Sequence, residues 1–159
     1  MIGVGLNNTQ PSSLQECTEM PSTGKGVRGE RELINLLWSH GYAALRAPAS
    51  GAASRTPRPD ILAGNSKLRR QLALELKVTH KKAIYVSKEQ IAGLAEFAQR
   101  FGCKPYLGVK FTAKRQPWIF IPIKRLRSAS GSFKVTPDIA AQDGLSLESL
   151  LGKNPETSK

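Results

Sequence analysis

The sequence predicts an α/β protein in which a mixed β-sheet is flanked by helices. Two observations carry this prediction. Several short segments alternate apolar with polar residues, as β-strands do, whereas two longer segments repeat apolar residues every three or four positions, as helices do. The expected order along the chain is a helix, three strands, a short strand, a second helix and two strands, and this mixture favours helices packed on a sheet.

The first helix is expected from Arg28 to Trp38, with Gly41 as its C-terminal cap. Its apolar stripe is formed by Leu33, Ile34 and Leu37. Glu30 lies three, four and seven positions before these residues and therefore shares their stripe. An acid that faces a core is costly unless it is paired or bound to a cation, which makes Glu30 a candidate site residue. The alternative is that Glu30 only complements the helix dipole.

Positive charge crowds the start of this helix, at Lys25, Arg28 and Arg31. The helix dipole disfavours cations at this end. A phosphate group bound there would remove the conflict, so these side chains are candidates for contacts with a nucleic-acid backbone.

Three strands follow, and the loop between the first two has a composition suited to binding. The strands are expected at 42–47, around 61–63 and at 71–77. Small residues and two arginines, Arg55 and Arg58, make up the loop from Ala49 onward, and no acid interrupts them. Such a loop is suited to meeting a ligand beside the next strand, although an ordinary exposed connection would have the same composition.

The second helix has a clear start and end in the sequence. Ser87 and Gln90 have the spacing of a capping box, and Gly102 ends the apolar stripe. The other expected elements are strands at 84–86, 106–111 and 118–121, a loop over 128–144 and a short helix over 145–151.

The residues that carry chemistry lie on the second and third strands. The third strand alternates leucines with polar residues, so Glu75 and Lys77 project from the same face. Pro59 cannot occupy a central strand and marks the entry of the second strand, directly before Asp60. If the two strands pair, Asp60 and Glu75 come together with Lys77 beside them.

This combination suits metal-dependent hydrolysis of phosphodiesters. Adjacent carboxylates repel unless a cation lies between them, and Mg²⁺ binds through one or two carboxylates together with substrate phosphate oxygens. A lysine beside the ion can orient a water or offset charge that develops on a phosphate. The pattern Pro-Asp followed by Glu-x-Lys resembles the PD-(D/E)xK nuclease signature, but an ordinary strand with a surface ion pair would carry the same letters.

The charge of the whole chain indicates a polyanionic partner. The net charge is +12 and the pI is about 10.1, which favours nucleic acid first and an anionic membrane surface second. Cys17 and Cys103 are too few for a disulfide framework or a zinc site, as His40 and His80 are for a histidine-based one, which favours a reducing, cytoplasmic location. No apolar run reaches the roughly 20 residues of a membrane span, and no signal-peptide pattern opens the chain.

One folded domain is expected for 159 residues. Residues 1–24 are polar and lack periodicity, so we expect a disordered leader there. The single domain, a nuclease, is expected over 25–151, followed by a flexible tail over 152–159.

Seven stretches stand in a characteristic order: Gly29-Glu30-Arg31-Glu32-Leu33, Arg46-Ala47-Pro48-Ala49-Ser50-Gly51, Pro59-Asp60-Ile61, Glu75-Leu76-Lys77, Ile84-Tyr85-Val86, Glu89-Gln90 and Leu107-Gly108-Val109-Lys110-Phe111. In this order and spacing they are similar to the archaeal Holliday junction resolvase family. The similarity extends from about Lys25 to about Leu150. It is far more specific than the short nuclease signature, and the leader lies outside it.

The resemblance implies a restriction-endonuclease-like fold, a homodimer, and paired Mg²⁺-dependent nicks in four-way DNA junctions during recombination and repair. It implies products with 5′-phosphates and 3′-hydroxyls. Asp60 and Glu75 match the family's metal-binding carboxylates, and Lys77 matches its catalytic lysine. Glu30 matches an essential acid of the first helix, expected in the metal site, and Ser50 matches a loop serine needed for activity.

The same resemblance extends the set of expected DNA contacts. Arg31 matches a basic residue beside the helix acid, and Arg46 is a further candidate, whereas the loop arginines rest on composition alone. The expected DNA-binding residues are Lys25, Arg28, Arg31, Arg46, Arg55 and Arg58. Mg²⁺ is the expected cofactor, with Mn²⁺ as an alternative ion that the sequence does not distinguish, and recombination or replication proteins at the nucleoid are candidate partners.

Three other functions remain open on the sequence alone. The first is another PD-(D/E)xK DNA nuclease of a repair or restriction type, which differs in preferring linear duplex over junctions. The second is a non-catalytic DNA-binding protein, against which the intact acids and lysine argue. The third is a basic RNA-binding protein, which is disfavoured because carboxylates without a metal would repel the phosphate backbone.

Overall fold

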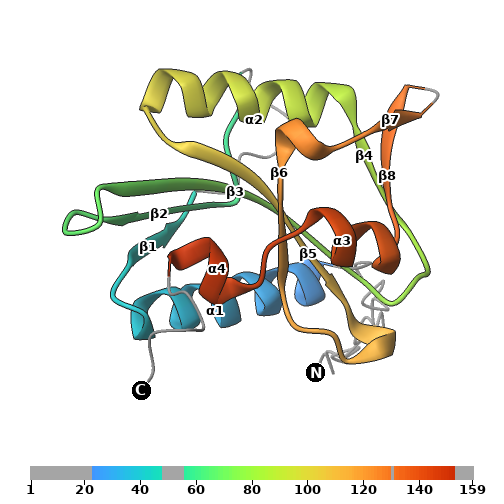
Figure 1. Ribbon diagram of the computed structural model, residues 1–159, viewed down its shortest axis with the longest axis horizontal. Coiled ribbons are helices and arrows are strands. Elements are labelled where there is room, and N and C mark those ends of the chain that lie inside the picture. Colours follow the sequence, from blue (N-terminus) through green and yellow to red (C-terminus); the bar gives the residue numbers. More distant parts are fainter. Residues whose placement is uncertain (1–22, 48–55, 130, 153–159) are drawn as a thin grey trace, which may run out of the picture.

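The computed structural model describes residues 23–47, 56–129 and 131–152 (Figure 1). The helices are α1 (Thr23–Ser39), α2 (Lys88–Phe101), α3 (Pro137–Asp143) and α4 (Leu147–Leu151), with 3-10 turns η1 (Thr112–Lys114) and η2 (Ile123–Arg125). The strands are β1 (Ala43–Arg46), β2 (Ile61–Asn65), β3 (Arg70–Thr79), β4 (Ile84–Ser87), β5 (Lys104–Phe111), β6 (Ile119–Pro122), β7 (Ser128–Ala129) and β8 (Ser132–Val135). Most of the predicted leader and tail, and the loop residues 48–55, lie outside the described residues.

A five-stranded sheet in the order β1-β2-β3-β5-β6 forms the centre of the molecule. Its strands are antiparallel except for β3 and β5, which are parallel. A parallel pair needs a long crossover, and here the crossover contains β4 and α2. α1 and α2 cover opposite faces of the sheet (Figure 1), so the predicted fold class, a mixed sheet flanked by helices, is confirmed.

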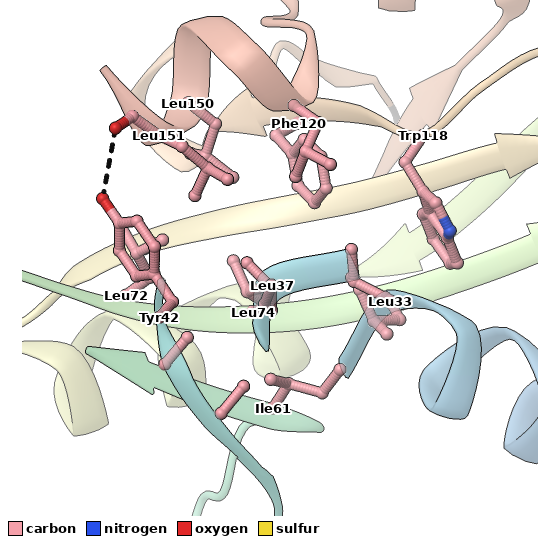
Figure 2. Close-up of a cluster of buried hydrophobic side chains, with 14 residues drawn as sticks. Leu33, Leu37, Tyr42, Ile61, Leu72, Leu74, Trp118, Phe120, Leu150 and Leu151 are labelled. Carbon is pink, nitrogen blue, oxygen red and sulfur yellow. Dashed lines mark hydrogen bonds between the residues drawn. The ribbon is translucent and has the colours of Figure 1, made fainter. Parts of the chain in front are cut away.

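The face under α1 carries the larger apolar core (Figure 2). Leu33 and Leu37 of α1 are fully buried, and they share this core with Ile61 of β2 and with Leu72 and Leu74 of β3. Full burial of one such side chain contributes roughly 1.5–3 kcal/mol. The burial of these side chains on this face therefore contributes strongly to the stability of the sheet.

The short final helix predicted over 145–151 is present as α4. Ser146 caps its start and Gly152 ends it in the left-handed conformation, with φ of 78°. Leu150 and Leu151 are buried, and the Tyr42 hydroxyl donates a hydrogen bond to the Leu151 carbonyl at 3.3 Å (Figure 2). The C-terminal helix thus closes the core beneath the sheet.

The face under α2 carries two apolar clusters. In one, Ala73 of β3 packs with Leu94 and Ala98. In the other, Ile91 of α2 packs with Leu107 and Val109 of β5.

The capping box predicted at the start of α2 is confirmed. The Ser87 hydroxyl accepts from the Gln90 N–H at 3.2 Å, and the Gln90 side chain accepts from the Ser87 N–H at 3.3 Å. α2 is thereby fixed directly after β4.

The prediction of a loop over 128–144 is wrong, because β7, β8 and α3 lie there. β4, β8 and β7 form a second, three-stranded sheet in which Ile84 pairs with Val135. Strands this short depend on distant partners, which local periodicity does not reveal. α3 does have a local signal, because Thr136 caps it and Pro137 occupies its first turn.

The first helix also begins earlier than predicted, at Thr23 instead of Arg28. Residues 23–26 contain no apolar side chain, so they extend the helix without extending its stripe. Among the described helices, none is long and apolar enough to cross a membrane.

Candidate active site beside the third strand

Asp60 lies at the entry to β2 and is held against β3. Its N–H donates to the Leu74 carbonyl at 2.9 Å, and its Oδ2 accepts from the Leu76 N–H at 2.7 Å. The carboxylate therefore accepts the hydrogen bond of a β3 N–H group that a main-chain carbonyl would accept in a regular β-ladder. Since Ile61 pairs with Leu74, Asp60 lies opposite Glu75.

Glu75 and Lys77 share one face of β3, as the alternation predicted. Leu74 and Leu76 belong to the core under α1, so the positions between and after them face α2. Lys77 Nζ donates to Glu75 Oε1 at 2.8 Å. The side chains of Glu75 and Lys77 are 13% and 29% exposed, so the pair is largely withdrawn from water but still open to a ligand.

An open groove lies between this part of β3 and α2. It is lined by Thr56, Pro57, Arg58, Asp60, Glu75, Glu89, Gln90, Gly93 and Leu94. A Cβ on Gly93 would lie 2.9 Å from the Pro57 Cβ, so glycine at this position lets the chain before Asp60 pass close to α2. The α2 residues are absent from the predicted site because their capping and packing positions do not reveal that α2 borders Asp60.

Glu30 approaches the same region from the α1 side of the sheet. Its Oε2 contacts Nε of Arg46, which lies at the end of β1. The Ala47 N–H donates to the Asp60 carbonyl at 3.0 Å, which holds this end of β1 beside the entry to β2. The Glu30 side chain is 13% exposed, whereas that of Arg46 is 41% exposed.

The three acids influence one another electrostatically without forming a closed cluster. The charge of Asp60 raises the pKa of both Glu30 and Glu75, and Glu30 adds to the effect on Glu75. Across residues 23–47, 56–129 and 131–152, however, no three His, Cys, Asp or Glu side chains are grouped closely enough to hold a metal ion. Each acid contacts a protein donor instead: Arg46, the Leu76 N–H or Lys77.

Burial is the main cause that raises the pKa of Glu75, and the neighbouring Asp60 charge is the second. Lys77 opposes both effects. Burial also raises the pKa of Glu30, against the lowering effect of Arg46. The ionised forms of both acids are therefore disfavoured in the folded protein, and an added cation would stabilise them.

The donor set fits a hard divalent cation such as Mg²⁺. This ion takes oxygen ligands and needs only one or two carboxylates beside waters and substrate oxygens. Asp60 and Glu75 supply two carboxylates on one side of the sheet. Glu30 Oε2 is buried and has no hydrogen bond of normal geometry among the described residues, although it touches Arg46. An acid oxygen left in this state is consistent with a cation ligand.

The remaining predicted site residues fall into two groups. The exposed ones, accessible to a phosphate backbone, are Arg28, Arg31, Arg46 and Arg58. The ones whose side chains lie outside the described residues are Lys25, Ser50 and Arg55. The Leu76 amide is a further contributor that side-chain patterns do not reveal.

Known proteins with similar sequences and folds agree with one another. The family model "Archaeal holliday junction resolvase (hjc)" matches residues 21–158. The "Crossover junction endodeoxyribonuclease Hjc" of Archaeoglobus fulgidus is 36% identical over 129 residues, which cover 81% of this chain and 90% of the relative. Its namesake from Sulfurisphaera tokodaii is 33% identical over 127 residues, covering 80% and 85%. The solved structure of the Archaeoglobus fulgidus protein, described as a Holliday junction resolvase, has a TM-score of 0.73 at 35% identity and covers 80% of this chain and 100% of that one.

Proposed function

Because the chain belongs to the archaeal Holliday junction resolvase family, it is a crossover junction endodeoxyribonuclease, and we propose that Asp60, Glu75 and Lys77 form its catalytic centre. One arrangement carries this proposal. The Asp60 carboxylate is fixed by the Leu76 amide, and the two neighbours of Leu76 in the sequence are the hydrogen-bonded Glu75 and Lys77. The groove beside them is open to a DNA strand.

We infer that this centre works with Mg²⁺ and accepts Mn²⁺. Asp60 and Glu75 would hold the ion, together with a main-chain carbonyl near Leu76, and Glu30 would complete the site or bind the ion's waters. The ion, when bound, would supply Lewis-acid polarisation of the scissile phosphate and of the attacking water.

Lys77 has a positioning and an electrostatic role in this proposal. Its hydrogen bond to Glu75 keeps the ammonium group beside the groove. From there the ammonium orients the attacking water and offsets the negative charge that grows on the phosphate in the transition state. In-line attack then yields the 5′-phosphate and 3′-hydroxyl that the family resemblance implies.

DNA recognition in this proposal depends on backbone contacts. The exposed Arg28, Arg31 and Arg58 would bind phosphates, so the enzyme would read the shape of the junction more than its sequence. Contacts from Lys25 and Arg55 and a role of Ser50 remain predictions. A chromosomal junction as substrate implies a cytoplasmic, nucleoid-associated site of action, near recombination or replication proteins.

We further infer a homodimer, because a four-way junction needs two cuts and each chain has one centre. Support comes from α2, where Phe101 is 55% exposed and stacks on Phe97 with ring centroids 5.5 Å apart. Phe97 is partly buried against the core, so it holds the exposed Phe101 ring beside a groove, and such an aromatic surface suits a two-fold contact with a second copy. Light scattering of Phe101→Glu should then give the mass of a monomer where the unchanged protein gives that of a dimer.

The catalytic proposal is tested with Asp60→Asn and Glu75→Gln on a labelled four-way junction. We expect cleavage in Mg²⁺ to fall at least about 100-fold in each, as when a group that stabilises a transition state is removed. Junction binding in EDTA should survive. Asp138→Asn removes an exposed acid from the first turn of α3 and serves as the control with unchanged cleavage. Near-normal cleavage by either site variant would exclude this centre, and a matched linear duplex measures the preference for junctions.

A further inference from the structure

The Glu30–Arg46 ion pair joins two residues with very different surroundings. Glu30 is 13% exposed, and its charge acts on Glu75 across the sheet. Arg46 is 41% exposed, and its chain neighbour Ala47 is hydrogen-bonded to the main chain of Asp60. One partner therefore faces the catalytic centre, while the other is accessible to DNA that enters beside Asp60.

The charge balance of the centre depends on this pair. Three carboxylates, those of Glu30, Asp60 and Glu75, lie with two cations, Arg46 and Lys77, which leaves one negative charge. If Arg46 moved to another anion, two negative charges would remain. That charge matches a divalent cation, and the effect is large because partly buried charges are weakly screened.

We propose that Arg46 is a positioning residue that couples DNA binding to metal binding by holding Glu30 until a backbone phosphate of the junction displaces it. In the DNA-free protein the guanidinium group contacts the Glu30 carboxylate and offsets its charge. A phosphate oxygen accepts from the same guanidinium with similar geometry, so exchanging carboxylate for phosphate costs Arg46 little and releases Glu30. The inference rests on the proposed metal centre.

In two other carboxylate–cation pairs, DNA binding would not release an acid to the metal site. Glu75 lines the groove and Lys77 is paired with it, and both belong to the proposed centre, so DNA binding would draw neither partner out of that centre. Glu32 lies on α1 like Glu30 but is 45% exposed and pairs with Lys110, outside the groove residues. Among the three carboxylate–cation pairs that involve α1 or the proposed centre in the described residues, the coupling is therefore assigned to Arg46 and Glu30.

Thermodynamic linkage makes the coupling reciprocal. If the junction raises the affinity for the cation, the cation must raise the affinity for the junction by the same factor, typically between about 5- and 150-fold. Neither effect requires cleavage. Both can therefore be measured as binding, independently of activity.

The first test is a double-mutant cycle on Mn²⁺ binding, read from the electron paramagnetic resonance signal of free Mn²⁺ with DNA absent. Arg46→Gln should tighten Mn²⁺ binding at least about fivefold. The same change in a Glu30→Gln background should have less than about a twofold effect, because the acid that Arg46 holds is gone. Lys110→Gln removes the cation that pairs with Glu32 on the same helix and is the matched control, expected to act equally and weakly in both backgrounds.

The second test measures junction binding in EDTA. Glu30→Gln frees Arg46 for phosphate and should tighten binding about threefold or more, within the usual range of such couplings. The matched control Glu32→Gln removes an acid from the same helix, outside the groove, and should change binding by less than about twofold. In the Glu30→Gln background, a second change Arg46→Gln should abolish the gain in junction affinity, and Arg46→Lys should retain part of it.

The outcomes separate this inference from the metal centre on which it rests. If the unchanged protein binds Mn²⁺ and Asp60→Asn binds it equally well, the proposed metal centre is wrong and the coupling is overturned with it. If Asp60→Asn abolishes binding but the Arg46 and Glu30 effects are additive, the centre stands and only the coupling is overturned. The coupling is likewise overturned if Lys110→Gln matches the effect of Arg46→Gln, or if Glu32→Gln matches that of Glu30→Gln.

Discussion

The two faces of β3 differ in what they contribute. Toward α1, Leu74 and Leu76 are 0% and 8% exposed and lie in the main apolar core. Toward α2, Ala73 packs in a small apolar cluster, and Glu75 and Lys77 follow it on the same face, where Glu75 lines the groove. Alternate residues of one strand therefore carry stability and chemistry separately, so a substitution on one face should leave the other property largely intact.

Leu74→Ala breaks the apolar face and should have the largest effect. We expect a loss of about 2–5 kcal/mol in the free energy of unfolding, because the transfer energy is lost and a cavity remains. Urea denaturation measures this loss. Leu68→Ala, at a residue that is 53% exposed, is the control and should stay within about 0.5 kcal/mol. A loss below about 1 kcal/mol for Leu74→Ala would contradict the assignment of stability to this face.

The effect of added Mg²⁺ on protein stability tests the charged face of β3. A cation that binds only the folded protein should raise its stability by about 2.7 kcal/mol at one hundred times its dissociation constant. Thermal melts with and without Mg²⁺ measure the rise. Asp60→Asn should remove the rise while Leu74→Ala should keep it, and an equal rise in Asp60→Asn would place the ion elsewhere.

Glu75→Gln should stabilise the metal-free protein while it removes activity. The pKa of Glu75 is raised in the folded state, so the folded protein holds this proton more tightly than the unfolded chain does. The resulting cost is absent below the ordinary value of 4.5 and fully present above the raised pKa. We expect Tm to rise by no more than about 2–4 °C at pH 7.5, with the gain fading toward pH 4. Calorimetry across this range measures it, and a Tm that falls at pH 7.5 would contradict the prediction.

Glu32→Gln should have the smallest effect. Its ion pair with Lys110 is partly exposed, and such pairs contribute about 0–1 kcal/mol. Cleavage should change by less than about twofold, in contrast to Glu30→Gln on the same helix. Parallel denaturation and cleavage assays of the two variants measure this difference, and equal losses of cleavage would show that α1 lacks a specialised acid.

The sequence was sufficient where a property is local. The alternation around Leu74 predicts that Glu75 and Lys77 share a face, and the Ser87 capping box predicts where α2 begins. Contacts between residues far apart in the sequence could not be predicted from local patterns. Nothing near Arg46 indicates that it contacts Glu30, and nothing near β8 indicates its pairing with β4.

Because β3 pairs with β5, which lies later in the chain, the proposed catalytic side chains are synthesised before their sheet can be completed. During synthesis, Glu30, Asp60, Glu75 and Lys77 are all made well before β5, the strand that pairs with the open edge of β3. Until then β3 has an open edge, and such an edge invites pairing with other chains. A product truncated before residue 104 would thus contain every proposed catalytic side chain and still be expected to aggregate rather than cut DNA.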